Sequence, residues 1–493
     1  MMKNYSDLEL LRFSKARRRG HKIGVFFASI PGKLKKFFVK IGHFFKNLVL
    51  GIGRWFKGIG TTFVHGDWKT KTSYFVMGFG NVTRKQILRG ILFFLFEVVF
   101  ILYMVFFGGR FLSKLYILGT KETYTTPDGV EVPGDNSFNI LLYGVLSLFF
   151  IAAFIYTWYL NIKQNRINEQ IIKEEKQLET SKDDLRALVD KNFHKTLLAL
   201  PTLGIIIFTV LPIFFMILVA FTEYDKNHAT LFGWAGFDNF GQLFNWTAGG
   251  ASFSMTFGQI LLWTLIWAFF ATFTNYFIGM LIAMLINKKG IKLKKLWRTV
   301  LVFSIAVPQF ISLMFVSRMF ATDGIINGIF HTHFDFWGHP WSARICVIVI
   351  NLWIGVPYLM LVVTGILMNI PKDLYESANI DGANGFQQYT KITLPYMLFI
   401  TGPYLLTSFT GNMNNFNVIY LLTGGGPTSA LDPMYGNAGK TDLLITWLYN
   451  LAINKSDYKF AAVVGILVFI VVAGISLIVY NIIPSTKNEE AFQ

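Results

Sequence analysis

The sequence predicts an all-α protein that crosses a membrane about eight times. Three observations lead to this fold class: a low fraction of charged residues, apolar runs of membrane-spanning length, and connecting segments that alternate in charge. Of the 493 residues, 53% are hydrophobic and 15% are charged, whereas soluble domains carry roughly 25% charged residues. A run of about 20 apolar residues can cross the hydrocarbon core as a helix.

Eight apolar stretches are long enough to span a bilayer. They cover about residues 88–107, 138–160, 196–221, 257–286, 299–319, 343–369, 396–422 and 459–482. The loop from Lys288 to Arg298 is strongly basic and contains no acidic residue, whereas the loop from Thr222 to Met255 is mainly acidic. The positive-inside rule places the basic loop in the cytoplasm. Counting spans from it places both termini and the segments 161–195 and 370–395 there as well.

Composition also excludes several classes of protein. The net charge of +17 would suit a nucleic-acid binder, but such proteins do not carry apolar runs of membrane-spanning length. We therefore expect no nucleic-acid partner. Because Cys346 is the only cysteine, an intrachain disulfide, a cysteine-rich zinc site and a CxxC redox motif are excluded.

The N-terminal residues 1–87 are expected to form a basic cytoplasmic region. Basic residues precede apolar ones, as in a secretory signal, but no compact apolar core with a small-residue cleavage site follows, so we expect the segment to be retained. Between Gly32 and Gly60, apolar residues recur every three or four positions with basic residues between them. This spacing predicts an amphipathic helix, which lies either at the inner membrane surface or on the protein's own cytoplasmic flank.

Two connections between spans are expected to have structure of their own. The segment from Lys163 to Lys195 is highly charged and is interpreted as a solvated helix that joins two spans. In the outer loop from Thr123 to Gly134, Pro127-Asp128-Gly129 is a turn signal between short extended runs. That pattern predicts a small β-hairpin.

The sequence contains no recognisable catalytic constellation. Gly439-Lys440-Thr441 matches the end of a phosphate-binding loop, but Met434 occupies the position of the required first glycine. The eight histidines form no HExxH motif. We therefore expect a chain that is not an enzyme and binds no cofactor of its own.

The most informative cytoplasmic segment covers about residues 370–395. Pro371 precedes a polar first turn, which predicts the start of a short helix. Gly382 permits a bend into a second short helix. Two short helices held between adjacent spans can insert into a groove of a partner protein. From the residues alone, a packed interhelical loop is the alternative.

The run from Glu376 to Ala383, followed by Ile392-Thr393-Leu394-Pro395, resembles the EAA signature of permeases in ATP-binding-cassette (ABC) importers, with Ser377 in place of the middle alanine. The resemblance implies the type I permease fold and a loop that docks in a cleft of a cytoplasmic ATPase. Glu376 then matches the acid that meets a basic residue of the ATPase. The coupling residues implied are Glu376, Ser377, Ala378, Asp381, Gly382, Ala383, Ile392, Leu394 and Pro395.

Residues 351–358 and 408–416 narrow the resemblance to the permeases of maltose and maltodextrin importers, over roughly the final 300 residues. It implies a sugar site near the bilayer midplane, formed by Asn351, Gly355, Tyr358, Ser408, Gly411, Asn412 and Asn415. Polar amides in hydrocarbon are unfavourable unless they pair or line a cavity. Asn412 and Asn415 are three positions apart, on one face of the expected helix. Packing between helices is the alternative role for these side chains.

Two departures from the enteric maltose permeases bear on the expected substrate. Gly411 replaces an aromatic residue, which favours a wider cavity and longer glucans. The large outer domain after the third span is missing, as in maltodextrin permeases of Gram-positive bacteria. Malto-oligosaccharides are the expected substrates, and galacto-oligosaccharides or sugars of the raffinose type are the alternatives.

The expected organisation follows the order of these elements. Residues 1–87 form the basic region, 88–195 an accessory transmembrane hairpin with its charged linker, 196–482 a six-helix permease core, and 483–493 a cytoplasmic tail. The resemblance implies a location in the bacterial cytoplasmic membrane. It also implies four kinds of partner: a second homologous permease, two cytoplasmic ATPase subunits that use ATP and Mg, an extracellular sugar-binding lipoprotein and the oligosaccharide.

An ion-coupled secondary transporter and a membrane-embedded enzyme are the alternative functions. Secondary transporters normally place ionisable residues at mid-membrane, whereas here Glu97 alone lies deep in a span, within the accessory hairpin. A membrane-embedded enzyme needs convergent acids or histidines at the interface, and the sequence does not cluster them. The sequence therefore predicts an oligosaccharide permease subunit.

Overall fold

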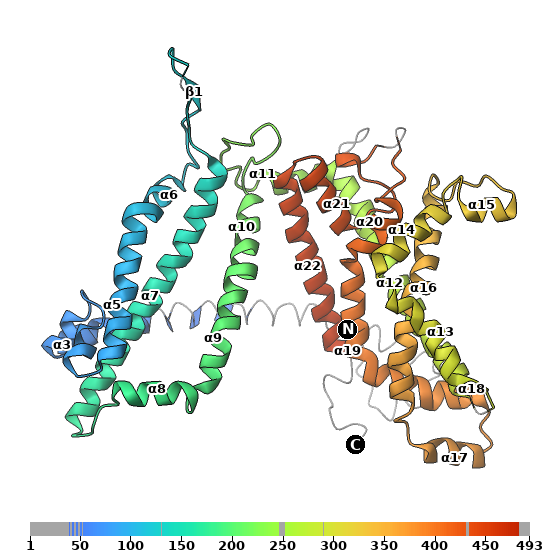
Figure 1. Ribbon diagram of the computed structural model, residues 1–493, viewed down its shortest axis with the longest axis horizontal. Helices are drawn as coiled ribbons and strands as arrows, with labels where there is room; N and C mark the ends of the chain where they lie inside the picture. The colour runs from blue at the N-terminus through green and yellow to red at the C-terminus, as the bar shows by residue number, and fades with distance from the viewer. Residues whose placement is uncertain are drawn as a thin grey trace, which may run out of the picture. The chain divides into compact units, whose positions relative to one another are not determined.

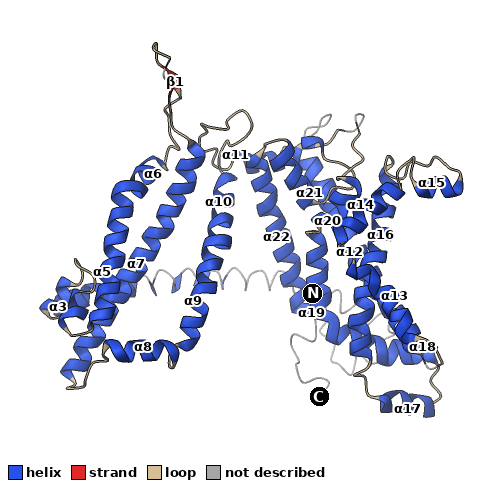
Figure 2. Ribbon diagram, viewed as in Figure 1, coloured by secondary structure: helices blue, strands red, loops and turns tan. Residues whose placement is uncertain are grey.

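The computed structural model describes residues 53–482 apart from 130, 246–251, 289 and 430–432, together with single positions between 39 and 51. This part of the chain is mostly helical and has one pair of short strands (Figures 1 and 2), as the sequence predicts. Residues 53–60 of the predicted amphipathic segment are helical, and the helix continues to residue 65. Most of the remainder of that prediction and the predicted tail at 483–493 lie outside the described residues.

The chain forms two compact units, residues 1–110 with 146–204 and residues 111–145 with 205–493. The long helix α7 contributes to both units. The helices whose residues lie mainly in the first unit are α3 (Trp68–Thr72), α4 (Phe79–Thr83), α5 (Ile87–Tyr103), η1 (Met104–Gly108), α7 (Ser137–Lys173), α8 (Ser181–Val189) and α9 (Phe193–Ile205).

The second unit contains the remaining elements. In chain order they are α6 (Gly109–Lys114), which begins at the end of the first unit, β1 (Tyr124–Thr125), β2 (Glu131–Val132), η2 (Ile206–Val210), α10 (Leu211–Val219), α11 (Asp238–Gly241), η3 (Gln242–Phe244), α12 (Phe253–Asn287), α13 (Lys294–Ala306), α14 (Gln309–Met319), α15 (Ile325–Phe330), α16 (Pro340–Leu367), α17 (Lys372–Ile380), α18 (Gly385–Gln388), η4 (Tyr389–Thr393), α19 (Leu394–Met413), α20 (Phe416–Thr423), η5 (Tyr435–Asn437), α21 (Leu444–Tyr449), η6 (Asn450–Asn454) and α22 (Tyr458–Ile482).

Seven helices of the described residues are long and apolar enough to cross a membrane, and an eighth crossing results if the bent pair α13–α14 is counted as one span. The predicted number of spans is therefore confirmed. The antiparallel pairing of β1 with β2 likewise confirms the predicted β-hairpin. Its turn contains Gly129 at φ 77°, a conformation that glycine adopts without strain.

The fifth predicted span, 299–319, is not a continuous helix. Helices α13 and α14 meet at an angle of 91°. Val307 between them has extended backbone angles, φ −81° and ψ 129°. The cause is Pro308, which disfavours helical geometry in the preceding residue and has no N–H to donate to the helix.

The prediction of one solvated helix over 163–195 is wrong. Its first part is the end of α7, which continues to Lys173, and α8 begins only at Ser181. Thr180 is the N-cap of α8. Its hydroxyl accepts the Asp183 N–H, and the Asp183 carboxylate accepts the Thr180 N–H. Such a capping box favours a new helix start over continuation of the previous helix.

Hydrogen bonds of buried polar side chains connect the short helices of the first unit to its long helices. Arg84, with a side chain that is 1% exposed, donates to both carboxylate oxygens of Asp67 at 2.7 Å and to the side-chain amide oxygen of Asn165 at 2.6 Å. The Glu97 carboxylate accepts the N–H of Met77 at 2.8 Å. Glu97, the one acidic residue expected deep in a span, therefore has a structural partner within its own unit.

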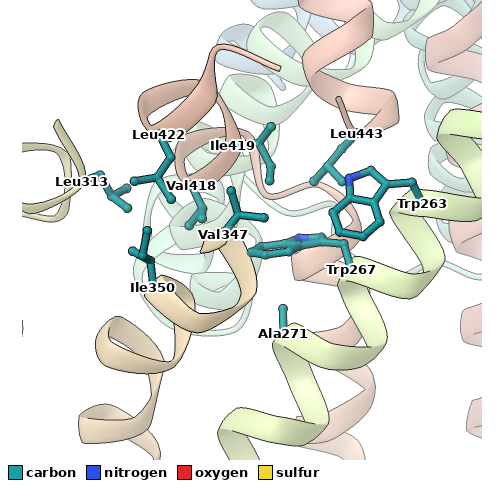
Figure 3. Close-up of a cluster of buried hydrophobic side chains, with 10 residues drawn as sticks. All are labelled: Trp263, Trp267, Ala271, Leu313, Val347, Ile350, Val418, Ile419, Leu422 and Leu443. Carbon is teal, nitrogen blue, oxygen red and sulfur yellow. The ribbon is translucent and has the colours of Figure 1, made fainter. Parts of the chain in front are cut away.

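The second unit is held together by tryptophan-rich packing. Trp267 and Trp263 of α12 pack with Val347 of α16 and Val418 of α20 in one buried cluster (Figure 3). The Trp263 indole N–H donates to the Thr441 carbonyl at 3.0 Å, so the loop after α20 is attached to the same cluster. A second cluster around Tyr276 and Met280 joins α12 to α16 and α19.

An ion pair connects the loop after α10 to the start of α22. Asp225 accepts from the Lys459 ammonium at 2.6 Å and from the His228 ring at 2.9 Å. Burial alone would raise the pKa of Asp225, but these two hydrogen bonds outweigh it and lower the pKa to about 2. The carboxylate therefore remains charged at neutral pH.

Helices α12 and α16 make the most extensive helix–helix contact of the described residues. Gly279 permits it, because a Cβ atom there would lie 2.9 Å from the Leu359 Cβ and 3.3 Å from the Met360 backbone nitrogen. Gly365 on α16 has no atom within 4 Å of such a position. Gly279 is thus a packing glycine, and Gly365 is its natural comparison.

We expect Gly279→Leu to destabilise the fold by roughly 1–3 kcal/mol, because the side chain overpacks the α12–α16 contact. Gly365→Leu, which faces open space, serves as the control. The measurement is the midpoint of thermal unfolding of the full chain in detergent. Equal midpoints for the two variants would contradict the close approach at Gly279.

Candidate functional site

A belt of polar residues crosses the middle of the second unit between its two apolar clusters. On α12 the tryptophan cluster ends at Ala271 and the second cluster begins at Tyr276. Thr272 and Asn275 lie between these positions, and both are buried. On α16, Asn351 and Gly355 lie in the same way between the cluster residues Ile350 and Leu359. These residues lie near the midpoints of α12 and α16, so the belt is expected near the bilayer midplane.

Asn412 of α19 lies at the centre of a hydrogen-bond network in this belt. Its amide nitrogen donates to the Thr272 hydroxyl at 3.0 Å, and its backbone carbonyl accepts the Trp267 indole N–H at 3.1 Å. Its amide oxygen accepts from Asn415 at 3.3 Å. Asn412 thus connects α19 to α12, and the side chain is held in one orientation.

The prediction that Asn412 and Asn415 share one helical face is wrong. Helix α19 ends at Met413, and Asn415 is the N-cap of α20, where its side chain accepts the Val418 N–H at 3.3 Å. Asparagine favours this capping role because its short side chain satisfies a free backbone donor. The two amides still meet, because the break between the helices turns Asn415 back toward Asn412.

Asn351 and Asn275 each bury an unpaired amide atom. Asn351 is 5% exposed and its amide nitrogen has no hydrogen-bond partner among the described residues. The Asn275 amide nitrogen donates to the Ala271 carbonyl, but its oxygen is unpaired. Gly355 leaves room for Asn275, since a Cβ atom at 355 would lie 2.4 Å from the Asn275 amide nitrogen. Buried polar atoms without partners are uncommon, so these two amides are unusual features of the belt.

The remaining predicted sugar-site residues are more accessible. Tyr358 is 51% exposed, and Tyr404 lies near both Tyr358 and Ser408. A Cβ atom at Gly411 would have no atom within 4 Å. The structure thus brings Asn412 and Asn415 into direct contact and leaves open space at Gly411.

Thr272, Asn275 and Tyr404 are further belt residues that the sequence analysis does not single out. Asn275 carries the same signal as Asn412, an amide within an apolar stretch, in the span predicted at 257–286. Thr272 carries no such signal, because isolated threonines are common in membrane helices. Its position in the belt depends on the pairing of α12 with α19.

The segment 370–395, which is predicted to be cytoplasmic, forms two short helices joined by a tight turn, as the sequence predicts. Gly382 has φ 75°, and its N–H donates to the Asn379 carbonyl at 3.1 Å, while the Ala383 N–H donates to the Ala378 carbonyl at 2.8 Å. These two bonds form a Schellman motif, which favours glycine at this position. Asn384 then caps α18 through reciprocal bonds with Gln387 at 2.9 Å.

One face of this segment is anchored and the other is exposed. The Tyr375 and Thr393 hydroxyls lie 2.9 Å apart, which holds α17 to the start of the next span. Leu394 packs against the second apolar cluster. Ile380 is 87% exposed and Phe386 is 74% exposed. The segment is therefore anchored on one side and has an apolar surface that the described residues do not cover.

The predicted coupling residues divide between these two faces. Those that are exposed are Glu376, Ser377, Asp381, Gly382 and Pro395, and those that are partly buried are Ala378, Ala383, Ile392 and Leu394. No ion pair involves Glu376 within the described part of the chain. Its carboxylate is therefore available to a cationic partner.

Comparison with known proteins is consistent with this geometry. Residues 275–487 match the family described as "Binding-protein-dependent transport system inner membrane component". The galactooligosaccharides transport system permease protein GanP of Bacillus subtilis (strain 168) is 33% identical over 430 residues, which cover 84% of this chain and 97% of that protein. The maltodextrin transport system permease protein MalC of Streptococcus pneumoniae serotype 4 (strain ATCC BAA-334 / TIGR4) is 33% identical over 439 residues, which cover 84% of this chain and 95% of that protein.

Among solved structures, a bacterial alginate ABC transporter in complex with alginate pentasaccharide-bound periplasmic protein matches 61% of this chain and 97% of its own chain, with 22% identity and a TM-score of 0.49. The relationship to the two permeases is much closer and extends over nearly their whole length. The chain therefore belongs to the family of binding-protein-dependent ABC import permeases, as a multi-pass, non-catalytic membrane subunit.

Proposed function

We propose that the chain forms one half of an oligosaccharide pathway and that the polar belt is its sugar site. The unpaired amide atoms of Asn275 and Asn351 carry this proposal. A sugar hydroxyl both donates and accepts hydrogen bonds, so a row of hydroxyls can pair with the Asn275 oxygen and the Asn351 nitrogen once alternating access opens the belt. The site then comprises Asn351, Gly355, Tyr358, Ser408, Gly411, Asn412 and Asn415, with Asn275 added.

The proposed substrates are malto-oligosaccharides. MalC is described as a maltodextrin permease, and the open space at Gly411 is compatible with a chain longer than a disaccharide. Galacto-oligosaccharides are the second candidate, because GanP, of equal identity, is described as a permease for them. Both sugars present rows of hydroxyls, so the belt amides alone do not discriminate between them.

We further propose that residues 370–395 couple the permease to a cytoplasmic ATPase. The exposed Ile380 and Phe386 supply an apolar surface, and the unpaired Glu376 supplies a charge for a basic residue of the ATPase. ATP binding would close two ATPase subunits and move this lever, which exposes the belt to alternate sides of the membrane. ATP and Mg would be bound by the ATPase subunits.

The proposed assembly also includes a second homologous permease and an extracellular sugar-binding lipoprotein. We place the complex in the bacterial cytoplasmic membrane with both termini in the cytoplasm, from the positive charge of the loop between Lys288 and Arg298. Residues 196–482 would form the transport core, and 88–195 an accessory hairpin.

Substitution of a belt amide should reduce sugar uptake without disassembling the transporter. We expect Asn351→Ala and Asn412→Ala each to lower uptake about fivefold or more, because a sugar hydroxyl loses one hydrogen bond. Asn481→Ala, at the end of α22 and bonded to its own helix, is the control. The measurement is uptake of labelled maltotriose by cells that contain all subunits. Unchanged uptake in both belt variants would place the sugar elsewhere.

Gly411→Phe should restrict substrate length, because the ring occupies space that a longer sugar uses. We expect uptake of maltohexaose to fall more than uptake of maltose. Gly474→Phe, also in open space but on α22, is the matched control. Equal losses of uptake for both sugars would show that Gly411 does not line the sugar cavity.

Two substitutions in the cytoplasmic segment should separate coupling from sugar binding. Glu376→Lys opposes the expected basic residue of the ATPase, and Gly382→Pro removes the N–H that Asn379 accepts and forbids φ 75°. Both should abolish copurification of the ATPase and sugar uptake. Asp128→Lys in the outer hairpin is the charge-matched control. Normal copurification with either variant would disprove the docking assignment.

A further inference from the structure

The first unit contains a small basic pocket that the transport function does not use. The pocket lies between the helical segment 53–65 and α7 and has a volume of about 220 Å³. Arg54, Lys163 and Arg166 line it together with the aromatic rings of Trp55 and Tyr159, whose centres are 5.6 Å apart. No acidic side chain is among its lining residues.

The three cations of this pocket lack counter-ions. The described residues record no ion pair for Arg54, Lys163 or Arg166, whereas the carboxylates nearby are engaged by other bases: Asp67 by Arg84, Glu169 by Lys173, and Glu179 and Asp184 by Arg89. Three unpaired cations around one pocket repel each other. An anion is the ligand that would relieve this repulsion.

The depth of the pocket matches the headgroup region of a bilayer. The apolar part of α7 begins next to Ser137, and Lys163 lies about 39 Å further along the helix at its rise of 1.5 Å per residue. The hydrocarbon core is roughly 30 Å thick, and a bilayer with its headgroups about 40–45 Å. Trp55 and Tyr159 are the residue types that gather at this interface.

A larger apolar groove lies on the other side of Lys163. Helices α5 and α7, which lie side by side (Figure 1), form this groove of about 630 Å³. Leu92 and Phe96 of α5 and Leu160 and Ile167 of α7 line it, and Lys163 borders both the groove and the basic pocket. An apolar groove that meets a cationic pocket matches an amphiphile with a negative headgroup.

We propose that this pocket binds the phosphodiester headgroup of an anionic glycerophospholipid, whose acyl chains lie along the groove between α5 and α7. Basic pockets between transmembrane helices bind such headgroups by the same charge complementarity. A free phosphate ion shares the headgroup chemistry but has no use for the apolar groove. The bound lipid would join the segment 53–65 to α7.

The test compares lipid retention by the full chain purified in mild detergent and incubated with equal amounts of phosphatidylglycerol and phosphatidylcholine. Native mass spectrometry should show selective retention of phosphatidylglycerol by the unmodified chain. Neutralising Arg54, Lys163 and Arg166 to Gln should weaken it by about fivefold per charge removed. Lys163→Arg, which keeps the charge, should retain the lipid.

The charge-matched control neutralises Lys176, Arg186 and Lys195, which are exposed and do not line the pocket. An equal loss of phosphatidylglycerol in this control, or no preference for that lipid in the unmodified chain, would overturn the proposal. Displacement of the lipid by millimolar inorganic phosphate would overturn it in favour of a soluble anion. Because the unmodified chain is tested directly, a variant that fails to fold does not decide the outcome.

Discussion

Polar groups inside a membrane protein are stabilised by hydrogen-bond partners within the protein. The second unit depends on two such hydrogen bonds, both made by Asn412. The Trp267 indole donates to the Asn412 carbonyl, and the Asn412 amide donates to the Thr272 hydroxyl. These two bonds join α12 to the end of α19 at the place where apolar packing is interrupted. No water is available in the bilayer core to replace a lost partner, so breaking either hydrogen bond costs free energy. The two bonds therefore hold α12 and α19 in register around the polar belt.

The breaks in the long helices follow from the same constraint. Where a helix stops inside the membrane, its free backbone groups need partners, and here side chains supply them. Asn415 caps α20 through the Val418 N–H, and the left-handed Gly424 ends the same helix. Irregular backbone at membrane depth is tolerated where it is buried in protein or lines a cavity. The position of the α19–α20 break beside Asn412 agrees with that rule.

Hydrogen bonds to a buried charged side chain hold the helices of the first unit together, as tryptophan packing does in the second unit. Arg84 collects Asp67, Thr70 and Asn165 around one guanidinium group, and removal of any partner would leave a buried group unsatisfied. The carboxylates of Asp67, Glu169 and Asp184 in this unit are each engaged by a base in this way. Arg54, Lys163 and Arg166 consequently have no ion pair among the described residues, and this imbalance distinguishes the basic pocket from an ordinary solvated face.

The sequence by itself determined the features that depend on neighbouring residues. Apolar length predicts the spans, Pro127-Asp128-Gly129 predicts the hairpin, and Pro371 with Gly382 predicts two short helices with a tight turn, because each signal acts within a few residues. Tertiary structure alone decided which side chains meet. Thr272 and Asn412 are 140 residues apart, and Asn275 reaches its place only because Gly355 on another helix has no side chain. Such contacts depend on how the helices pack against each other, and a local sequence pattern does not predict this packing.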